Sequence, residues 1–393
     1  MSFSSFIAFW DRIKIIQSIL ILVILAISCR GKSNRDVVDK VHENKIEISK
    51  AERFNLEKKN GYTILTIMNP WQGAKDLNQV YYLVDRGNKI PALMDTSLVI
   101  LVPVKKIICM STTHVAMISA LGEEKTISGM SGTGLIYDRN LAGRFGKGLI
   151  SDVGYEANLN KEMILKIAPE LIMMYGIGSE SSSYIGKIKE LGVKVVFNAD
   201  YLEKDPLSKV EWIKVFGAFY CKENLADSIF NSEAKKYNDL KTYINQKITY
   251  RPKVLLGLPF KDTWYISPGN SFVSKLINDA GGDYIWQNTK SEISMPMGIE
   301  NVYLRALTAD FWLNIGSVRT KDEISIVDQR LTALPCFKKG NLYNNNNRTT
   351  KEGGNDYWES GSIYPHRILK DIATILHPDL FSGEELFYYR KIN

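Results

Sequence analysis

Seven aromatic residues fall in or beside predicted loops, where their side chains could contact a ligand. They are Trp71, Tyr155, Tyr201, Trp264, Tyr265, Tyr357 and Trp358. Aromatic rings bind flat conjugated groups through their faces, and the polar tips of tyrosine and tryptophan add hydrogen bonds. Aromatic side chains beside loops are also common as plain packing, so we expect about half of the seven to contact a ligand. This chemistry is recognition rather than catalysis.

A second candidate is the segment Ser111-Thr112-Thr113, between a predicted buried strand and a helix that ends at Gly122. Serine and threonine are favoured caps at the start of a helix. The free N–H groups there face the carboxyl end of the strand, where open α/β sheets bind ligands. The next residue, His114, is predicted to be a cap or a packed imidazole rather than a metal ligand.

Motifs for catalysis are weak. Residues 127–134 are rich in glycine but lack the Lys-Ser/Thr pair of a phosphate-binding P-loop, so they predict an ordinary loop. A secreted α/β hydrolase is the main alternative; the chain has His366 and His377 near its C-terminus but no G-x-S-x-G elbow. A lipoprotein that binds free metal ions is a third reading, and four widely separated histidines argue against it. We therefore predict that the chain is not an enzyme, with no metal or cofactor of its own.

The N-terminus predicts export and lipidation. Arg12 and Lys14 precede a short aliphatic run, residues 19–27, as in a signal peptide. The sequence Leu25-Ala26-Ile27-Ser28-Cys29 resembles a lipobox, in which Cys29 receives lipid and becomes the mature N-terminus. A plain secretory signal or a single anchor helix is the alternative, although the run is short for a membrane span. Residues 1–29 are thus predicted to be a signal peptide, and the polar residues 30–54 a flexible tether.

Composition fits a globular protein of two domains. The chain has 393 residues, of which 45% are hydrophobic and 24% charged. Its net charge of +7 comes from scattered lysines, so it predicts no nucleic-acid partner. Besides Cys29 the cysteines are Cys109, Cys221 and Cys336, which we interpret as buried thiols, with one bridge among them left open.

Strand–helix–strand patterns lie on both sides of a long helical stretch, residues 206–248. Its apolar positions recur every three or four residues, and Asp205-Pro206 provide a cap and a first helical residue. Two ordinary surface helices are one reading; the setting favours a long helix that joins two lobes. We predict an α/β fold of two Rossmann-like lobes with parallel sheets. The N-lobe is residues 55–205, with an N-terminal β-hairpin extension, and the C-lobe is residues 249–393.

Several segments together resemble the class III substrate-binding proteins of ABC importers, which capture vitamin B12, ferric siderophores and haem. The segments are the strand, cap and helix of residues 107–122, Asn158-Leu159, Pro169-Glu170-Leu171, residues 268–272 with Ala280-Gly281-Gly282, residues 339–343, and His377-Pro378. The N-terminal extension and residues 355–361 resemble Bacteroidetes-type lipoproteins of this family.

This resemblance implies two lobes on a rigid helix and a metal-chelate ligand (an iron-siderophore, cobalamin or haem) bound between them. The ligand would lie between loops bearing Trp71, residues 111–113 and Tyr155 and loops bearing Trp264, Tyr265 and Trp358, with Trp264 as the main anchor. It also implies that Glu162 and Glu300 dock on the permease of an ABC permease–ATPase complex, with Val302 in place of Glu300 by strict register. The protein is expected to be monomeric and held at the membrane, facing the periplasm.

Overall fold

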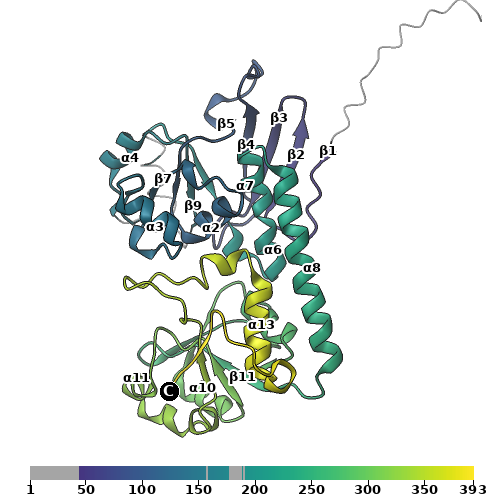
Figure 1. Ribbon diagram of the computed structural model, residues 1–393, viewed down its shortest axis with the longest axis vertical. Helices are drawn as coiled ribbons and strands as arrows, with labels where there is room; N and C mark the ends of the chain where they lie inside the picture. Colours follow the sequence, from purple (N-terminus) through teal and green to yellow (C-terminus); the bar gives the residue numbers. More distant parts are fainter. Residues whose placement is uncertain (1–43, 156–157, 177–187, 189–190) are drawn as a thin grey trace, which may run out of the picture. The chain divides into compact units, whose positions relative to one another are not determined.

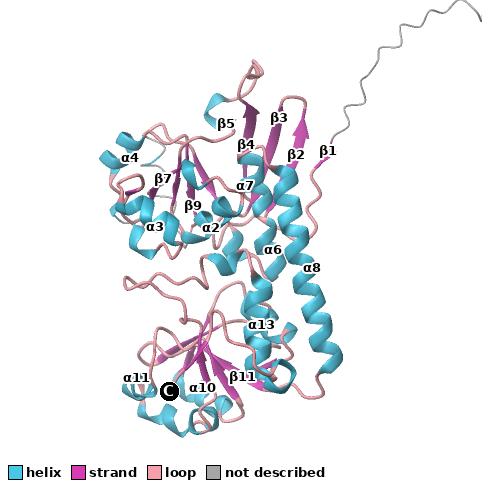
Figure 2. Cartoon of the chain, in the orientation of Figure 1, coloured by secondary structure: helices cyan, strands magenta, loops and turns pink. Residues whose placement is uncertain are grey.

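The computed structural model describes residues 44–155, 158–176, 188 and 191–393, and residues Glu43–Asn393 form one compact unit. Two α/β lobes lie within this unit, one carrying β1–β10 and the other β11–β17 (Figures 1 and 2). The predicted fold class is therefore confirmed. The signal peptide and Cys29 lie outside the described residues. Within them, no helix has the length and apolar character needed to cross a membrane.

The N-terminal extension is a five-stranded sheet rather than a hairpin. The strands follow the order β1-β2-β3-β4-β5, antiparallel except for the parallel pair β4–β5. Their bounds are β1 Asn44–Lys45, β2 Phe54–Lys59, β3 Tyr62–Met68, β4 Asn78–Asp85 and β5 Val99–Val102. Burial alternates along β3, so Thr63, Leu65 and Ile67 face the core.

The prediction of a flexible tether is wrong for its last residues, because buried carboxylates accept hydrogen bonds from their backbone N–H groups. The backbone N–H groups of Ser49, Lys50 and Ala51 donate to the carboxylate of Glu211 at 2.7–2.8 Å. Glu211 is fully buried and also pairs with Lys214 at 3.1 Å. Such a carboxylate needs these donors to offset its desolvation, so the segment is held against the N-lobe.

The N-lobe sheet is parallel, with the order β10-β9-β6-β7-β8. The bounds are β6 Ile107–Cys109, β7 Ile127–Met130, β8 Ser151–Asp152, β9 Leu171–Met174 and β10 Val195–Phe197, with helices α2 Thr112–Ala120, α3 Arg139–Gly146 and α4 Lys161–Ile167. The predicted loop at residues 127–134 is wrong for its first four residues, which form strand β7. A Cβ at Gly129 would lie 2.9 Å from side-chain atoms of Ile108 and Ile167, so this glycine serves close packing.

Three helices follow the N-lobe in the predicted linking region: α6 Pro206–Glu211, α7 Ile213–Phe219 and α8 Glu223–Lys247. Every residue of α7 is buried. Helix α8 has 25 residues, which is about 37 Å of helix. It packs on α7 near its start and on α9 and α13 beyond, and in Figure 1 it runs alongside both lobes. The long-helix interpretation is thus favoured over two surface helices.

The C-lobe sheet has the order β13-β11-β15-β16-β17, in which only β17 is antiparallel. The strands are β11 Lys253–Leu256, β13 Asp283–Tyr284, β15 Phe311–Leu313, β16 Leu342–Asn344 and β17 Arg390–Lys391, beside a separate pair β12 Thr263–Ile266 and β14 Met295–Gly298. The helices are α9 Phe272–Asp279, α10 Ile299–Ala306, α11 Lys321–Val327, α12 Pro335–Lys338 and α13 Pro365–Leu376. Cys109 and Cys336 are buried thiols as predicted, whereas Cys221, in the turn between α7 and α8, is exposed.

Candidate functional site

Three adjoining cavities share Phe272 and Trp358 in their linings, and two of the three are lined by residues of both lobes. We call them together the interlobe cleft. The central cavity measures about 250 Å³, a side cavity about 410 Å³, and a cavity on the C-lobe about 630 Å³. The central cavity is lined by both lobes, with Ser111, Thr112, Thr113, Tyr175, Asp200, Tyr201 and Lys209 on one side and Phe272, Tyr357, Trp358, Gly361, Ser362 and Ile368 on the other.

The N-lobe wall begins at the carboxyl end of β6. Ser111 caps α2, its Oγ accepting the N–H of Thr113 at 3.3 Å. The hydroxyl oxygens of Ser111 and Thr113 lie 3.0 Å apart. Since strand and helix meet here, hydroxyls and free N–H groups of the first helical turn face the cavity, which suits an anionic group of a ligand.

Two opposite charges complete this wall. Asp200 is buried, and burial raises its pKa while the charge of Lys209 opposes the shift. Burial likewise lowers the pKa of Lys209, and Asp200 and Glu203 oppose that shift. The Lys209 ammonium lies 4.4 Å from the ring centroid of Phe272, so this contact joins the two walls.

The C-lobe wall is aromatic. Tyr357 is buried, with its ring centroid 4.7 Å from that of Trp358 and about 6 Å from those of Tyr388 and Tyr389. Burial raises the pKa of Tyr357 to about 12. Trp358 itself remains 53% exposed. Tyr357 therefore supports Trp358 from behind, and Trp358 presents a free surface to the cleft.

Contacts between the lobes fix the loop that carries Trp358. The next residue, Glu359, is buried, and its carboxylate accepts the N–H groups of Tyr137 at 2.7 Å and Asp138 at 2.9 Å. Burial raises the pKa of Glu359 to about 7, with smaller contributions from Asp356 and Asp138. Earlier in the same loop, the Thr350 hydroxyl donates to the carbonyl of Gly134.

Several predicted residues do come together here. Ser111, Thr112, Thr113, Tyr201, Tyr357 and Trp358 all line the central cavity, and Tyr265 lines the cavity on the C-lobe. The Tyr201 hydroxyl donates to the carbonyl of Gly176 and accepts the N–H of Gln72. Tyr201 therefore has a fixed ring position at the cleft edge.

Trp264 does not line the cleft, contrary to the prediction. It is fully buried, its Nε1 donates to the carbonyl of Leu256 at 3.0 Å, and its ring packs 5.8 Å from that of Trp312. The alternation of β12 points Trp264 into the core and its neighbour Tyr265 outward. The expected main anchor is thus a core residue in this structure.

Two other predicted residues lie outside the three cavities. Trp71 is half-buried, with its ring 5.3 Å from that of Phe197. Tyr155 is 60% exposed and lies next to Gly132. Both follow strands as predicted, but neither side chain lines the cleft.

Sequence reasoning missed Phe272, Lys209 and Asp200 as cleft residues. Phe272 is the last residue of the segment 268–272 that carries the resemblance, but its ring was not predicted to contact a ligand. Lys209 and Asp200 carried no motif. Lys209 lies in α6, the first linking helix, and Asp200 lies in a short helical turn that precedes α6.

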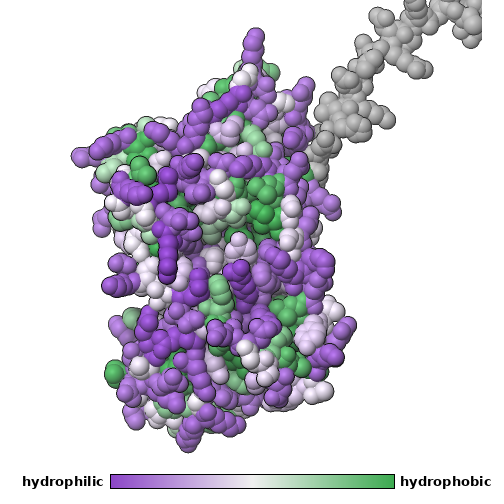
Figure 3. Space-filling view, viewed as in Figure 1, coloured by the Kyte–Doolittle hydropathy of each residue, from purple (hydrophilic) through white to green (hydrophobic). Residues whose placement is uncertain are grey.

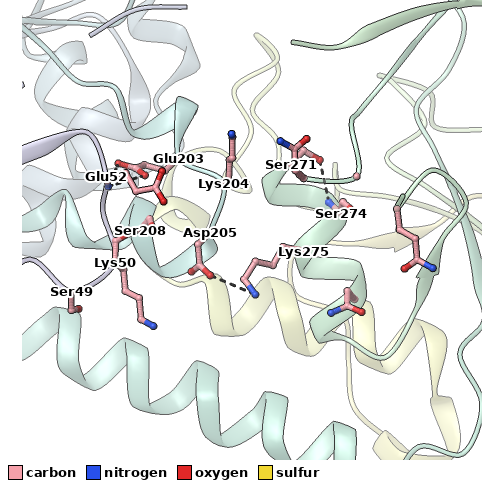
Figure 4. Close-up of a pocket in the computed structure, with 14 residues that line it drawn as sticks. Ser49, Lys50, Glu52, Glu203, Lys204, Asp205, Ser208, Ser271, Ser274 and Lys275 are labelled. Carbon is pink, nitrogen blue, oxygen red and sulfur yellow. Dashed lines mark hydrogen bonds and ion pairs between the residues drawn. The ribbon is translucent and has the colours of Figure 1, made fainter. Parts of the chain in front are cut away.

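A fourth cavity of about 570 Å³ lies beside the side cavity and shares Glu203, Lys204, Asn270 and Ser271 with it. Figure 4 shows Asp205 and Lys275 in this cavity pointing toward each other, 3.6 Å apart. Glu203 accepts the N–H groups of Glu52 and Arg53. Because these charged groups are paired within the protein, this cavity is not part of the candidate site. Among the described residues, no group of three or more His, Cys, Asp or Glu side chains could hold a metal ion.

A cleft of this kind between two α/β lobes agrees with the comparison with known proteins. The sequence profile of a periplasmic binding protein family matches residues 107–344. The chain belongs to this family. The resemblance to class III binding proteins is therefore confirmed. This family is the substrate-binding component of ABC importers, and its members bind solutes rather than catalyse reactions, in agreement with the prediction that the chain is not an enzyme.

One relative is an uncharacterised lipoprotein of Methanocaldococcus jannaschii, 30% identical over 355 residues, which covers 83% of this chain and 81% of the relative. Two solved structures share the fold. A protein of Staphylococcus epidermidis, described as a possible iron-binding protein, has 17% identity and a TM-score of 0.54, covering 70% of this chain and 99% of that one. A periplasmic haem-binding protein of Pseudomonas aeruginosa has 15% identity and a TM-score of 0.53, covering 74% and 98%.

Proposed function

We propose that this chain is a lipid-anchored binding protein that captures a metal chelate in the interlobe cleft and delivers it to an ABC permease–ATPase complex. The chelate is an iron-siderophore or a related compound such as cobalamin or haem. The observation that carries the proposal is Trp358, a half-exposed indole supported by Tyr357 and facing a cavity lined by both lobes. Structural neighbours described as haem-binding and iron-binding support the same class of ligand.

The two walls suit two parts of such a ligand. The indole of Trp358 and the ring of Phe272 offer apolar faces to a conjugated or apolar part of the chelate. Lys209 and the first turn of α2 offer positive charge and donors to a carboxylate or other anionic group, where the helix terminus adds ~1 kcal/mol. A monomer suffices for this task, since one chain supplies both walls.

Absorbance spectroscopy tests the ligand class. Protein purified from its native host is expected to carry the absorbance bands of its chelate, which differ among haem, cobalamin and ferric siderophores. Titration of the ligand-free protein with each compound should then give one-to-one binding for at least one of them. If none of the three binds at micromolar concentration, the proposed ligand class is wrong.

A matched pair of variants ties binding to the cleft. Trp358→Ala should weaken binding, whereas Phe260→Ala should leave it unchanged. Phe260 is a suitable control because it is an aromatic C-lobe residue, 67% exposed, outside the three cavities. Equal losses in both variants would argue against binding at Trp358.

We propose further that Glu162 and Glu300 dock on the permease. Both are exposed in the first turn of a helix, Glu162 in α4 and Glu300 in α10, where the side chain of Glu300 is 83% exposed and 3.5 Å from Arg330. The alternative residue Val302 is fully buried, which supports Glu300. A carboxylate is also favoured at any helix start, so the test needs both sites.

Reversing both charges, with Glu162→Lys and Glu300→Lys, should abolish uptake of the chelate by cells while its affinity for the purified protein stays the same. Glu385→Lys, a reversal at another exposed C-lobe glutamate, serves as the control. Uptake that survives the double reversal would refute the docking residues without affecting the ligand proposal.

We propose finally that lipid on Cys29 holds the protein at the membrane, facing the periplasm. The lipoprotein name of the M. jannaschii relative supports the lipid anchor. Fatty-acid labelling should mark the wild type and not Cys29→Ser, and the variant should be released or left uncleaved. A wild type without label would remove the anchor from the proposal.

A further inference from the structure

The loop between β4 and β5, residues 86–98, exposes apolar side chains to solvent. Leu93 is fully exposed, more than any other large hydrophobic residue of the described chain, and Ile90 is 40% exposed. Most of the surface seen in Figure 3 is hydrophilic. A fully exposed leucine buries no surface in the fold, and two apolar side chains exposed on one short loop offer a small apolar surface to a partner.

The loop is held by hydrogen bonds along its length. The N–H of Met94 donates to the carbonyl of Pro91 at 3.0 Å, so residues 91–94 form a turn with Leu93 near its apex. Asp95 caps the short helical turn that follows, its side chain accepting the N–H of Ser97 at 2.9 Å. Arg86 at the loop's start donates to the carbonyl of Pro103 and pairs with Glu170 at 2.6 Å. The exposure of Leu93 is therefore built into an ordered loop.

The loop lies at the end of the sheet where the N-terminal segment joins it. Asn44 in β1 is paired with Lys58 near the end of β2, and the following turn contains Gly61, whose carbonyl accepts the side-chain amide of Asn88 at 3.1 Å. Figure 1 shows the loop beyond the ends of β4 and β5, at the same end as the β2–β3 turn. The first strand thus begins at the same end of the sheet as this loop, on the opposite edge.

The proposed lipid on Cys29 limits how far this end of the sheet can lie from the membrane. Residues 30–43 separate Cys29 from β1 and span at most about 50 Å when fully extended. A lipid on Cys29 would keep the loop within reach of the bilayer surface. Lys89, exposed beside Ile90, adds a positive charge that suits lipid phosphates.

We propose that Ile90 and Leu93 insert into the headgroup region of the membrane that holds the anchor, so that the extension sheet orients the protein on the lipid surface. This inference rests on the proposed lipidation of Cys29 and is independent of the ligand. Apolar side chains next to a basic residue are the composition that binds the membrane interface. A single weak contact of this kind adds to the anchor because the anchor already holds the loop close to the lipid.

The test uses the full lipidated chain in vesicles of phosphatidylcholine and phosphatidylglycerol, with Leu93→Trp as the reporter. Its control is Leu304→Trp, on the C-lobe helix α10, since Leu304 is 68% exposed. In vesicles made with brominated lipid, the emission added by Leu93→Trp should be quenched by at least half and shifted to shorter wavelength. The emission added by Leu304→Trp should be unchanged.

Three results would overturn the proposal. One is unquenched emission of Leu93→Trp in protein that floats with the vesicles. Another is a shift of the emission to shorter wavelength that appears only when the permease is present and without quenching by brominated lipid, since this would identify a protein partner. The third is a chain that carries no lipid and does not float, which removes the anchor itself. Chelate titration of the same samples keeps each of these separate from a failure of the ligand proposal.

Discussion

The two walls of the interlobe cleft are built differently. The N-lobe wall is polar, and the ends of regular elements position it: β6 runs into the cap of α2, and Asp200 and Lys209 stand at the start of the linking helices. The C-lobe wall is aromatic, and Trp358 is carried by a loop fixed through Glu359 to the other lobe. The N-lobe wall therefore suits an anionic group of a ligand, while the C-lobe wall suits a conjugated or apolar part of it. Four variants probe this difference.

The largest effect is expected on stability, from Trp264→Ala. Removing a fully buried indole that packs on Trp312 should cost about 3–5 kcal/mol in the free energy of unfolding. Because Trp264 lies in the core, the folded variant should bind its chelate as the wild type does. Denaturant unfolding with a binding titration checks both, and a tenfold loss of affinity in folded protein would return Trp264 to the cleft.

Trp358→Ala should weaken ligand binding while leaving the stability of the fold nearly unchanged. We expect a loss of about 2 kcal/mol in binding, more than tenfold in affinity, because an anchor ring in a cavity is removed. The melting temperature should change little, since the side chain is half-exposed. Unchanged affinity would mean that the aromatic wall does not hold the ligand.

Lys209→Met tests the polar wall. Affinity for a chelate with a carboxylate should fall about fivefold, or ~1 kcal/mol, and its dependence on salt should weaken. The matched control is Lys247→Met, because Lys247 is an exposed lysine at the end of α8 that lines none of the four cavities. If both variants bind alike at low and high salt, Lys209 does not contact an anionic group.

The smallest effect concerns pH and Glu359. Its pKa is about 7 in the folded protein against 4.5 ordinarily, so the folded state holds this proton more tightly than the unfolded state. Its contribution to stability is therefore complete below pH 4.5 and is lost as the pH rises through 7. In the wild type the melting temperature should therefore fall as the pH rises through 7. Glu359→Gln should reduce this fall by roughly a few degrees. Asp371, whose pKa is raised to about 6 by burial, stays in both proteins and leaves a residual slope. An identical profile in the variant would show that Glu359 does not titrate in this range.

The sequence was sufficient for the parts that rest on local rules. Helix capping identified Ser111–Thr113, and helical periodicity identified the linking helices. It failed where a neighbour far along the chain decides. Adjacent aromatic residues Trp264 and Tyr265 cannot be assigned to core and surface without the register of β12 against β14. The ordering of residues 49–54 depends on buried Glu203 and Glu211, about 150 or more residues later, which resemble surface charges in sequence.

The same limit explains the cleft residues. Phe272, Lys209 and Trp358 belong to a helix start, a linking helix and a loop that are far apart in the sequence and meet only in the tertiary structure. No residue spacing around these three residues predicts that their side chains line the same cleft. The resemblance supplied Trp358 through its segment, whereas Lys209 had no such segment.

The central claim is that a metal chelate lies between these two walls, and anomalous X-ray scattering from a crystal of the complex tests it most directly. The iron or cobalt of the chelate gives a peak whose position requires no assumption about the ligand. The account predicts one strong peak in the interlobe cleft, with the chelate against the face of Trp358 and the first turn of α2. A peak in the fourth cavity, around Asp205 and Lys275, or on the outer surface would contradict it.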